Sequence, residues 1–274
     1  LFRSAGGGRL ALATQLIHAV RKEQFELHYQ PIVRSGEGGL AGFEALVRWR
    51  HPERGLLAPG AFIEAAEETG LILPLGAWVM ERAVEQMTAW TRQTPAATEL
   101  HVSVNVSARQ FVDNDLYDQV KRALEAGGQG NGGLAPGRLK LEITESLIMN
   151  DPVGAARALR SLKELGVRLA LDDFGTGYSS LSYIGRFPFD VLKIDRSFVQ
   201  AMLNRYEVMT VVETICALGA RLGLEMVGEG VEREEEAEAL RGLGCHLSQG
   251  YLYGRPMTAD DAAALIRQSF SGRG

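Results

Sequence analysis

Carboxylate side chains recur at the ends of short apolar segments of this 274-residue chain. They are Glu44 in FEALVRW, Glu142 in LEITES, Asp172 and Asp173 in LALDDFG, and Glu229 in MVGEGVE. Any one acid in such a position has an ordinary explanation as a helix N-cap or a surface charge. Several carboxylates directed to one place would repel one another unless cations bound between them. Their recurrence therefore favours a metal site.

The alternation of a β-strand decides which residues share a face with these acids. In FEALVRW, it places Glu44, Leu46 and Arg48 on one face and only apolar side chains on the other. The apolar face should meet helices, so the acid and the base point inward, where unpaired charge is expensive. In HVSVNVS the same alternation directs Asn105 inward, so we expect an amide beside the carboxylates.

The candidate ligands are all oxygen donors, with no His or Cys among them, which selects Mg²⁺ or Mn²⁺ over Zn²⁺. Adjacent Asp172 and Asp173 suggest a bridge between two ions. Such a pair would activate a water and stabilise the charge on phosphoryl oxygens. Lys193 of LKID could steady that charge, and a free carboxylate could accept the proton of the water. Asp195 of the same segment is equally a candidate N-cap for the helix that follows.

Charge and motif content exclude several other functions. The 29 Lys and Arg against 34 Asp and Glu give a net charge of −5, which offers no attraction to polymeric DNA or RNA. A small anionic substrate stays compatible with this charge, because bound cations can invert the charge of an acidic pocket. The five histidines form no HExxH or HD pair, which argues against a zincin or an HD-type hydrolase. No GxxxxGK[ST] loop is present, which excludes a nucleotide-triphosphate motor.

Short strand-like segments alternate with helical patterns along most of the chain. Eight strands are expected at residues 25–33, 40–49, 99–106, 138–143, 167–172, 190–194, 223–228 and 244–249. Helices are expected at residues 60–68, 72–92, 113–126, 151–165, 197–221, 232–242 and 258–268. Repeated strand–helix units of this number favour a parallel sheet closed into a barrel, since closure removes exposed edges.

The first two strands are the exception to this alternation. Only the six residues 34–39 separate them, too few for a crossover helix, so they should pair as an antiparallel hairpin. The predicted fold class is therefore α/β, a modified TIM-type (β/α)8 barrel with one antiparallel strand near the N-terminus. We expect the barrel to span residues 23–270, after a linker and amphipathic helix over residues 1–22.

Composition indicates an ordinary globular protein, with 46% hydrophobic and 23% charged residues. Cys216 and Cys245 lack CxxC spacing, so we expect two small buried apolar residues in a reducing compartment. The sequence has no run of about 18 apolar residues, the length of a transmembrane helix, and its N-terminus lacks the charged-then-apolar pattern of a signal peptide. The expected location is the cytoplasm, or the cytoplasmic part of a larger, membrane-anchored protein. Because the chain starts at Leu1, we expect it to be a piece of that longer protein.

A set of short motifs gives the chain a specific resemblance over about residues 10–268. They are HYQPIV (28–33), EALVRW (44–49), SVNVSARQF (103–111), LEITES (141–146), DDFGTGYSSL (172–181), LKID (192–195), VGEGVE (227–232) and QGY (249–251). Together they resemble the EAL-domain family of cyclic di-GMP phosphodiesterases. The resemblance implies a modified barrel whose early strand runs antiparallel, in agreement with the predicted hairpin.

The resemblance also implies a role for each matching polar residue. One Mg²⁺ or Mn²⁺ ion would be held by Glu44, Asn105, Glu142 and Asp172. A second ion would be served by Asp172, Asp173 and Glu229. Glu229 would alternatively be the general base, Lys193 would assist the water or phosphate, and Glu145 would brace the DDFGTGYSS loop. Substrate would be bound by Gln30, Leu46, Arg48, Asp195 and Gln249.

The implied reaction is hydrolysis of one phosphodiester of cyclic di-GMP to linear pGpG, with Ca²⁺ as an inhibitory ion. A catalytically silent cyclic di-GMP receptor is the alternative, and such receptors usually lose one or more of the acids, which are all present here. A purely structural domain would leave the inward acids unexplained. The resemblance further implies a homodimer and fusion to an upstream sensory or GGDEF-type domain. Two departures from the family pattern are Gly228, where Ala is more usual, and His246, where Asp is frequent.

Overall fold

A closed ring of eight strands forms the centre of the fold. The computed structural model describes residues 12–20, 22–36, 38–112, 115–127, 134–175 and 185–271. The strands of the ring are β1 (Phe25–Arg34), β2 (Leu40–His51), β4 (His101–Asn105), β5 (Leu139–Thr144), β6 (Arg168–Phe174), β7 (Val191–Ile194), β8 (Glu225–Gly228) and β9 (Leu247–Gln249). Their order is β1-β9-β8-β7-β6-β5-β4-β2, and a β1–β2 pairing closes it. The predicted barrel is confirmed.

Strand direction is uniform except at β1. β1 pairs antiparallel with both β2 and β9, whereas the pairings from β2 through β4 to β9 are parallel. The register joins Gln30 to Glu44 and Phe25 to Trp49 across the β1–β2 hairpin. The predicted antiparallel hairpin is therefore confirmed. A further short strand, β3 (Gly55–Leu57), pairs antiparallel with the end of β2 outside the ring and was not predicted.

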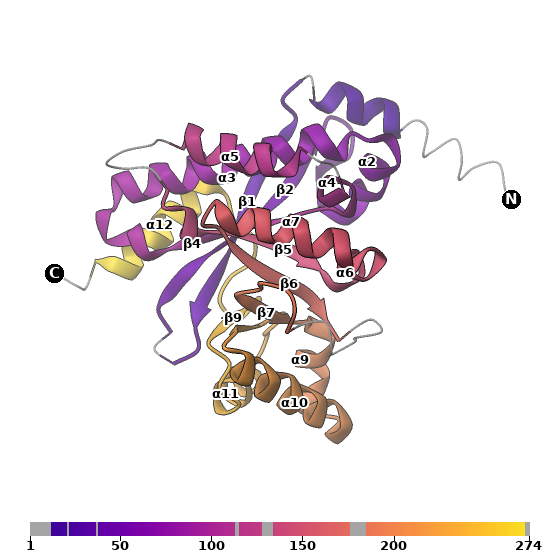
Figure 1. The fold of residues 1–274 in the computed structure, drawn as a ribbon. Coiled ribbons are helices and arrows are strands. Elements are labelled where there is room, and N and C mark those ends of the chain that lie inside the picture. Colours follow the sequence, from indigo (N-terminus) through magenta and orange to yellow (C-terminus); the bar gives the residue numbers. More distant parts are fainter. Residues whose placement is uncertain are drawn as a thin grey trace, which may run out of the picture.

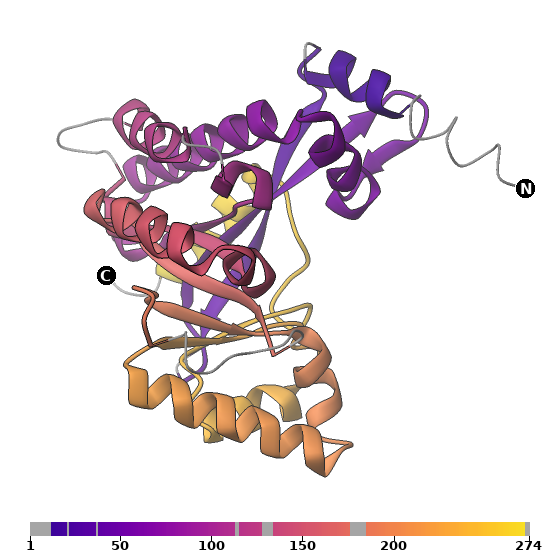
Figure 2. The ribbon, with the colours of Figure 1, turned by 45° about the vertical axis from the view of Figure 1, so that its right-hand side comes forward.

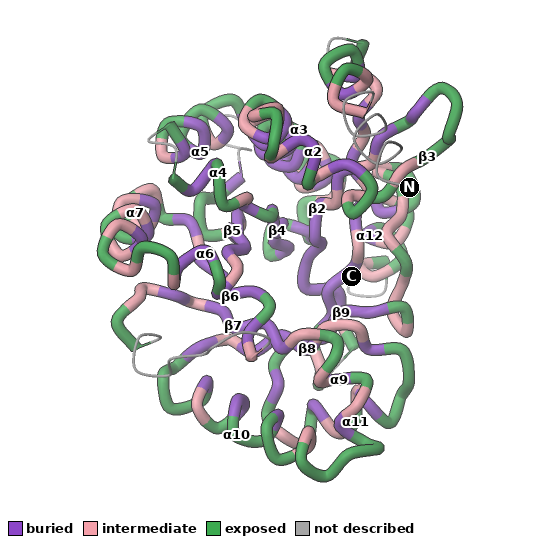
Figure 3. Tube along the Cα trace, turned by 90° about the vertical axis from the view of Figure 1, so that its right-hand side faces the viewer, coloured by how far each residue is buried: buried purple, intermediate pink, exposed green. Residues whose placement is uncertain are grey.

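Helices surround this ring. They are α2 (Ile63–Thr69), α3 (Ile72–Gln93), α4 (Ala108–Val112), α5 (Leu116–Ala126), α6 (Glu145–Asn150), α7 (Pro152–Glu164), α9 (Arg196–Met202), α10 (Tyr206–Leu222), α11 (Glu234–Gly242) and α12 (Ala259–Phe270). In Figures 1 and 2, α3, α5 and α7 lie on one side of the barrel and α9, α10 and α11 on the opposite side. Viewed in the direction of Figure 3, the strands circle the centre and the helices turn exposed faces outward.

One predicted helix is divided in two in the structure, and several short helices were not predicted. The single helix predicted at 197–221 is α9 followed by α10, because the chain turns at Asn204 and is extended at Arg205. Asn competes for backbone hydrogen bonds and so disfavours helix interiors. The short helices α4 and α6, and a 3₁₀ turn at Pro59–Ala61 before α2, were missed, since segments this short show little periodicity.

The barrel interior is layered. Inward positions of the strands carry an apolar layer made of Ile32, Ala41, Ala170, Val191, Val227 and Leu247. Toward the amino ends of the parallel strands, Lys140 is 2% exposed and lies 2.7 Å from Glu225, which Arg168 also contacts at 3.0 Å. Two residues after members of the apolar layer, toward the other end, come Asp172, Lys193, Glu229 and Gln249. The apolar layer thus closes the barrel beneath the polar residues at its mouth.

The outward face of β2 meets helices as predicted. Phe43, Ala45, Val47 and Trp49 are all buried, at 0%, 3%, 8% and 0% exposure. A helix over residues 12–20 precedes β1 and buries Leu16 and Ala19 against the same core. The linker predicted before it, and most of the loop predicted at 127–137, lie outside the described residues.

The two cysteines are free and buried, as expected for small apolar residues. Burial raises the pKa of the Cys216 thiol to about 11 and that of the Cys245 thiol to about 12, so both are unreactive near neutral pH.

Across the described part of the chain, the helices are too short or too polar for a membrane span.

Gly42 provides a test of strand packing. A Cβ at this position would lie 2.3 Å from the His101 carbonyl oxygen on the paired strand β4, and backbone cannot yield easily. We expect Gly42→Ala to lower the free energy of unfolding by about 1–3 kcal/mol, the usual cost of overpacking. Gly60→Ala is the control, because nothing lies within 4 Å of its added Cβ. Urea denaturation of both variants measures the difference, and equal stabilities would contradict this packing.

Candidate active site

Glu44 is held by amide side chains from two other strands. Its Oε1 accepts a hydrogen bond of 2.6 Å from Asn105 Nδ2, and its Oε2 accepts one of 2.6 Å from Gln249 Nε2. Gln249 Nε2 also donates to Gln30 Oε1 at 3.1 Å, and Gln30 Nε2 donates to the Gly254 carbonyl oxygen at 3.3 Å. This chain of hydrogen bonds fixes the Glu44 carboxylate at the barrel mouth.

Lys193 lies at the centre of a second set of contacts. Its Nζ is 2.6 Å from Glu142 Oε2, 3.3 Å from Asp172 Oδ1 and 2.5 Å from Glu229 Oε1. Burial alone would lower the pKa of this 2% exposed ammonium, but the surrounding carboxylates outweigh it and hold the pKa well above the usual value. Lys193 therefore stays charged and offsets part of the repulsion among the acids.

A bulge in β6 turns Asp172 and Asp173 toward the same region. The register with β7 shifts between Leu171 and Phe174, and Asp173 has a φ of 54°. The Asp173 N–H donates to Asp172 Oδ1 at 2.9 Å. Consecutive residues of a regular strand point to opposite faces, so the bulge is what lets both carboxylates share one side. A left-handed non-glycine residue costs about 1–3 kcal/mol, and such strain is concentrated at functional sites.

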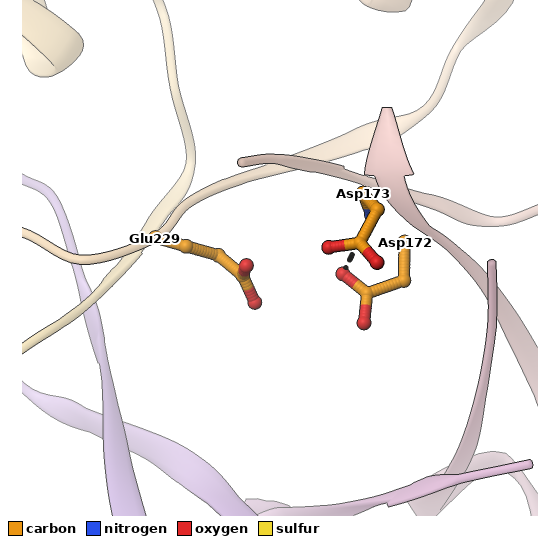
Figure 4. Close-up of side chains that lie close together, drawn as sticks. All are labelled: Asp172, Asp173 and Glu229. Atoms are coloured by element: carbon orange, nitrogen blue, oxygen red, sulfur yellow. Dashed lines mark hydrogen bonds between the residues drawn. The ribbon is translucent and has the colours of Figure 1, made fainter. Parts of the chain in front are cut away.

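The two aspartates and Glu229 form a group that could hold a cation. One carboxylate oxygen from each of Asp172, Asp173 and Glu229 lies within 4.8 Å of the others. Figure 4 shows the Glu229 side chain, which follows β8, reaching toward the two aspartates on β6. Glu44 and Glu142 bring the cluster to five carboxylates, against one neutralising ammonium. Oxygen donors with this excess of negative charge fit Mg²⁺ or Mn²⁺.

Three acids of the cluster have raised pKa values, which shows that burying their negative charges together is unfavourable. Burial raises the pKa of Glu142 well above its usual value, although Lys193 opposes the shift. Burial likewise raises the pKa of Glu229 to about 8, again against Lys193. Burial and the charge of Asp172 raise the pKa of Asp173. A bound divalent cation would relieve the repulsion that otherwise favours the protonated acids.

The mouth opens into a cleft of about 250 Å³. Of the predicted site residues, the cleft is lined by Gln30, Glu44, Leu46, Asp172, Lys193, Glu229 and Gln249. It is also lined by Arg196, Gln200, Gly230, Glu232, Gly250 and Tyr251, which were not predicted as site residues. Arg196 directly follows LKID and Tyr251 ends QGY, so their positions beside predicted residues were the available signal.

Four further residues singled out from the sequence lie outside the carboxylate cluster. Asp195 caps α9, since its Oδ1 accepts from Ser197 N at 3.0 Å, so the N-cap alternative describes what it does here. Arg48 is half-buried and donates to its neighbour Val47 O at 2.9 Å. Glu145 Oε2 accepts from Gly175 N at 3.4 Å and so contacts the start of the DDFGTGYSS loop, whose residues 176–180 lie outside the described residues. His246 Nδ1 accepts from Met226 N at 3.0 Å, an acceptor role that an Asp could also fill.

The raised pKa of Glu229 predicts a pH dependence of magnesium binding. A carboxyl whose pKa is raised by folding stabilises the metal-free fold while protonated, so that stability falls as the pH rises through about 8. Mg²⁺ needs the deprotonated carboxylate. We expect Mg²⁺ to raise Tm by about 2–4 °C more at pH about 8.5 than at about 6.5. Scanning calorimetry at both pH values measures this difference.

Glu229→Gln is the control, because its amide does not titrate. In this variant the difference between the two pH values should be smaller, and what remains reflects Glu142 and Asp173, whose pKa values are also raised. An equal shift in the unsubstituted chain would mean that Glu229 does not compete between proton and metal.

Comparison with known proteins places this geometry in context. The family model described as EAL domain matches residues 13–256. The relative described as bifunctional diguanylate cyclase/cyclic di-GMP phosphodiesterase MucR, from Pseudomonas aeruginosa, is 43% identical over 258 residues, covering 94% of this chain and 37% of the relative. Cyclic di-GMP phosphodiesterase PdeR of Escherichia coli is 39% identical over 250 residues, covering 91% and 36%. The chain thus spans about a third of the length of these curated relatives.

Solved structures of EAL proteins are also similar to this chain. A structure described as PaMucR phosphodiesterase in complex with c-di-GMP is similar at a TM-score of 0.86 and 43% identity, covering 92% of this chain and 99% of that one. The EAL enzyme Bd1971 with cAMP and cyclic di-GMP bound is similar at a TM-score of 0.90 and 33% identity, covering 96% and 70%.

Proposed function

Because this chain belongs to the EAL domain family, we propose that it hydrolyses cyclic di-GMP to linear pGpG with two divalent cations, Mg²⁺ or Mn²⁺. The observation that carries this proposal is the convergence of five carboxylates and one lysine at the mouth of the barrel. Relatives named as cyclic di-GMP phosphodiesterases, and a relative's structure with c-di-GMP, support the choice of substrate.

The five acids and Asn105 form two sets that would hold the cations. The first set is Glu44, Asn105, Glu142 and Asp172, and the second is Asp172, Asp173 and Glu229. When bound, the ions would supply Lewis acidity at a phosphoryl oxygen and a lowered pKa for the attacking water. The chain itself keeps Glu44 in a fixed orientation through the two amides that donate to it.

Proton transfer and charge balance would fall to Glu229 and Lys193. The pKa of Glu229 is raised to about 8 in the metal-free site, and bound cations would lower it toward the range suited to a proton acceptor near neutral pH. Lys193 stays protonated beside Glu229 at 2.5 Å and would counter the negative charge that develops as the phosphodiester is attacked. The apolar layer below the site excludes water from the barrel interior, so these charges act in a medium of low dielectric constant.

The remaining polar residues of the mouth would position the substrate. Gln30, Leu46 and Gln249 line the cleft, and Arg48 and Asp195 lie outside its lining. We propose that the first three contact substrate directly and that Arg48 does so after a change of rotamer. Asp195 would act by fixing the start of α9. Glu145 would act by fixing Gly175, two residues after Asp173.

The whole protein would carry further domains, in keeping with relatives of whose length this chain covers 37% and 36%. An upstream sensory or GGDEF-type domain and a homodimeric assembly are the arrangements that we propose for it.

Turnover is the direct test of this function. The chain is incubated with cyclic di-GMP and Mg²⁺ or Mn²⁺, and the nucleotides are separated by ion-pair chromatography. We expect pGpG to accumulate with metal and not with a chelator. Binding of cyclic di-GMP without pGpG would show a receptor, and absence of binding would contradict both functions.

Glu44→Gln tests the metal set. The amide removes a negative ligand, so we expect turnover to fall by more than the about 10–100-fold that loss of an outer-shell partner costs. Glu164→Gln, at an exposed position of α7, is the matched control and should keep full activity. Activity within twofold of the unsubstituted chain in Glu44→Gln would remove Glu44 from the metal set.

Glu229→Gln separates catalysis from binding. Without a proton acceptor at this position, we expect turnover to fall by about 100-fold or more. Binding of cyclic di-GMP with Ca²⁺, measured by calorimetry, should change by less than about fivefold. Parallel loss of substrate binding and of the folded state would show instead that Glu229 is structural.

A further inference from the structure

The cleft continues past the carboxylates onto a surface formed by α9 and the segment before α11. Beyond Glu229 it is lined by Arg196, Gln200, Gly230 and Glu232. Arg196 is the first residue of α9 and is exposed. Arg196 lines the same cleft as the acids, although no role was predicted for it from the sequence.

Arg196 differs from the other cation of the cleft in its partners. Lys193 contacts three carboxylates directly. Among the residues that the structure describes, Arg196 has no ion pair and no side-chain hydrogen bond, and its charge acts on Asp173 only at longer range, where it lowers the pKa of that acid. The nearby acid Glu232 instead accepts a hydrogen bond from Gln200 at 3.2 Å. The Arg196 guanidinium is therefore available to a ligand in the cleft.

Backbone contact fixes Arg196 relative to Glu229. Gly230 has a φ of 66°, and a Cβ there would lie 2.3 Å from Arg196 Cβ and 3.2 Å from Arg196 Cα. The residue after Glu229 thus packs directly on Arg196. In addition, Glu229 N donates to Ile194 O at 3.1 Å. The acid and the arginine are held as one unit at the mouth.

We propose that Arg196 binds the phosphodiester group of cyclic di-GMP that is not cleaved. The inference rests on the proposed function, in which the substrate is a ring with two phosphodiesters. When one phosphodiester occupies the carboxylate cluster, the other must lie elsewhere in the same cleft. Two divalent cations and Lys193 would balance the five carboxylates of the cluster. Farther along the cleft Arg196 supplies a guanidinium, the group suited to bind a phosphodiester in a fork.

Binding in the presence of Ca²⁺ tests this assignment. Cyclic di-GMP is compared with the linear dinucleotide GpG, which has a single phosphodiester, by isothermal calorimetry. A charge-assisted hydrogen bond predicts that Arg196→Ala weakens cyclic di-GMP binding by about 10–100-fold. GpG binding should change by less than about twofold, and Arg196→Lys should recover part of the loss. Arg221→Ala, at an exposed position of α10, is the matched control and should leave both affinities unchanged.

Kinetics give a second readout. Because Arg196 would not touch the reacting phosphodiester, Arg196→Ala should raise KM about 10-fold or more and change kcat by less than about threefold. Unchanged cyclic di-GMP affinity, or an equal loss for cyclic di-GMP and GpG, would overturn the role of Arg196. Failure of the unsubstituted chain to bind cyclic di-GMP would instead contradict the proposed function.

Discussion

The concentration of like charge at one end of the barrel is the constraint on which the rest of the site depends. Five carboxylates face one buried ammonium, that of Lys193, which contacts three of them. Side chains on flexible loops would move apart under this repulsion. Glu142, Asp172 and Lys193 instead project from adjacent parallel strands, whose pairing fixes their backbone. The apolar layer beneath them excludes water from the barrel interior. The fold therefore supplies the rigidity that makes the acids available to cations.

Strain is the second means by which the chain gathers these groups. A regular strand can direct only every other residue to the mouth, and β6 must direct two neighbours. The bulge and the left-handed backbone of Asp173 accomplish this, and Glu145 holds the following turn through Gly175 N. The pairings of β6 with β5 and β7 are continuous up to the bulge, and their hydrogen bonds offset the free energy of the strained backbone.

Much of this could be predicted from the sequence, because alternation and strand number are properties of periodic patterns. The ring of eight strands, the hairpin and the inward direction of Glu44 followed from such patterns, and the acids that they directed to the mouth do meet there. The bulge at Asp173 could not be predicted, since it depends on the register with β7. The same holds for Lys193 as a counter-charge, because its partners come from three separate segments. Short elements such as β3 and α4 were missed because they contain less than two periods of their pattern.

The reversed direction of β1 also decides where the barrel is joined to what precedes it. In an all-parallel barrel, the first strand enters at the end opposite the catalytic loops. Here Phe25 begins β1 beside Trp49, five residues beyond Glu44 in β2, so the helix over residues 12–20 lies at the catalytic end, as does α6 in Figure 1. Gln24 links this entry point to β2, through its Oε1 to Trp49 Nε1 and its carbonyl oxygen to Arg50 N. A displacement of the preceding segment would thus be transmitted to the strand that carries Glu44 through the covalent chain and these hydrogen bonds.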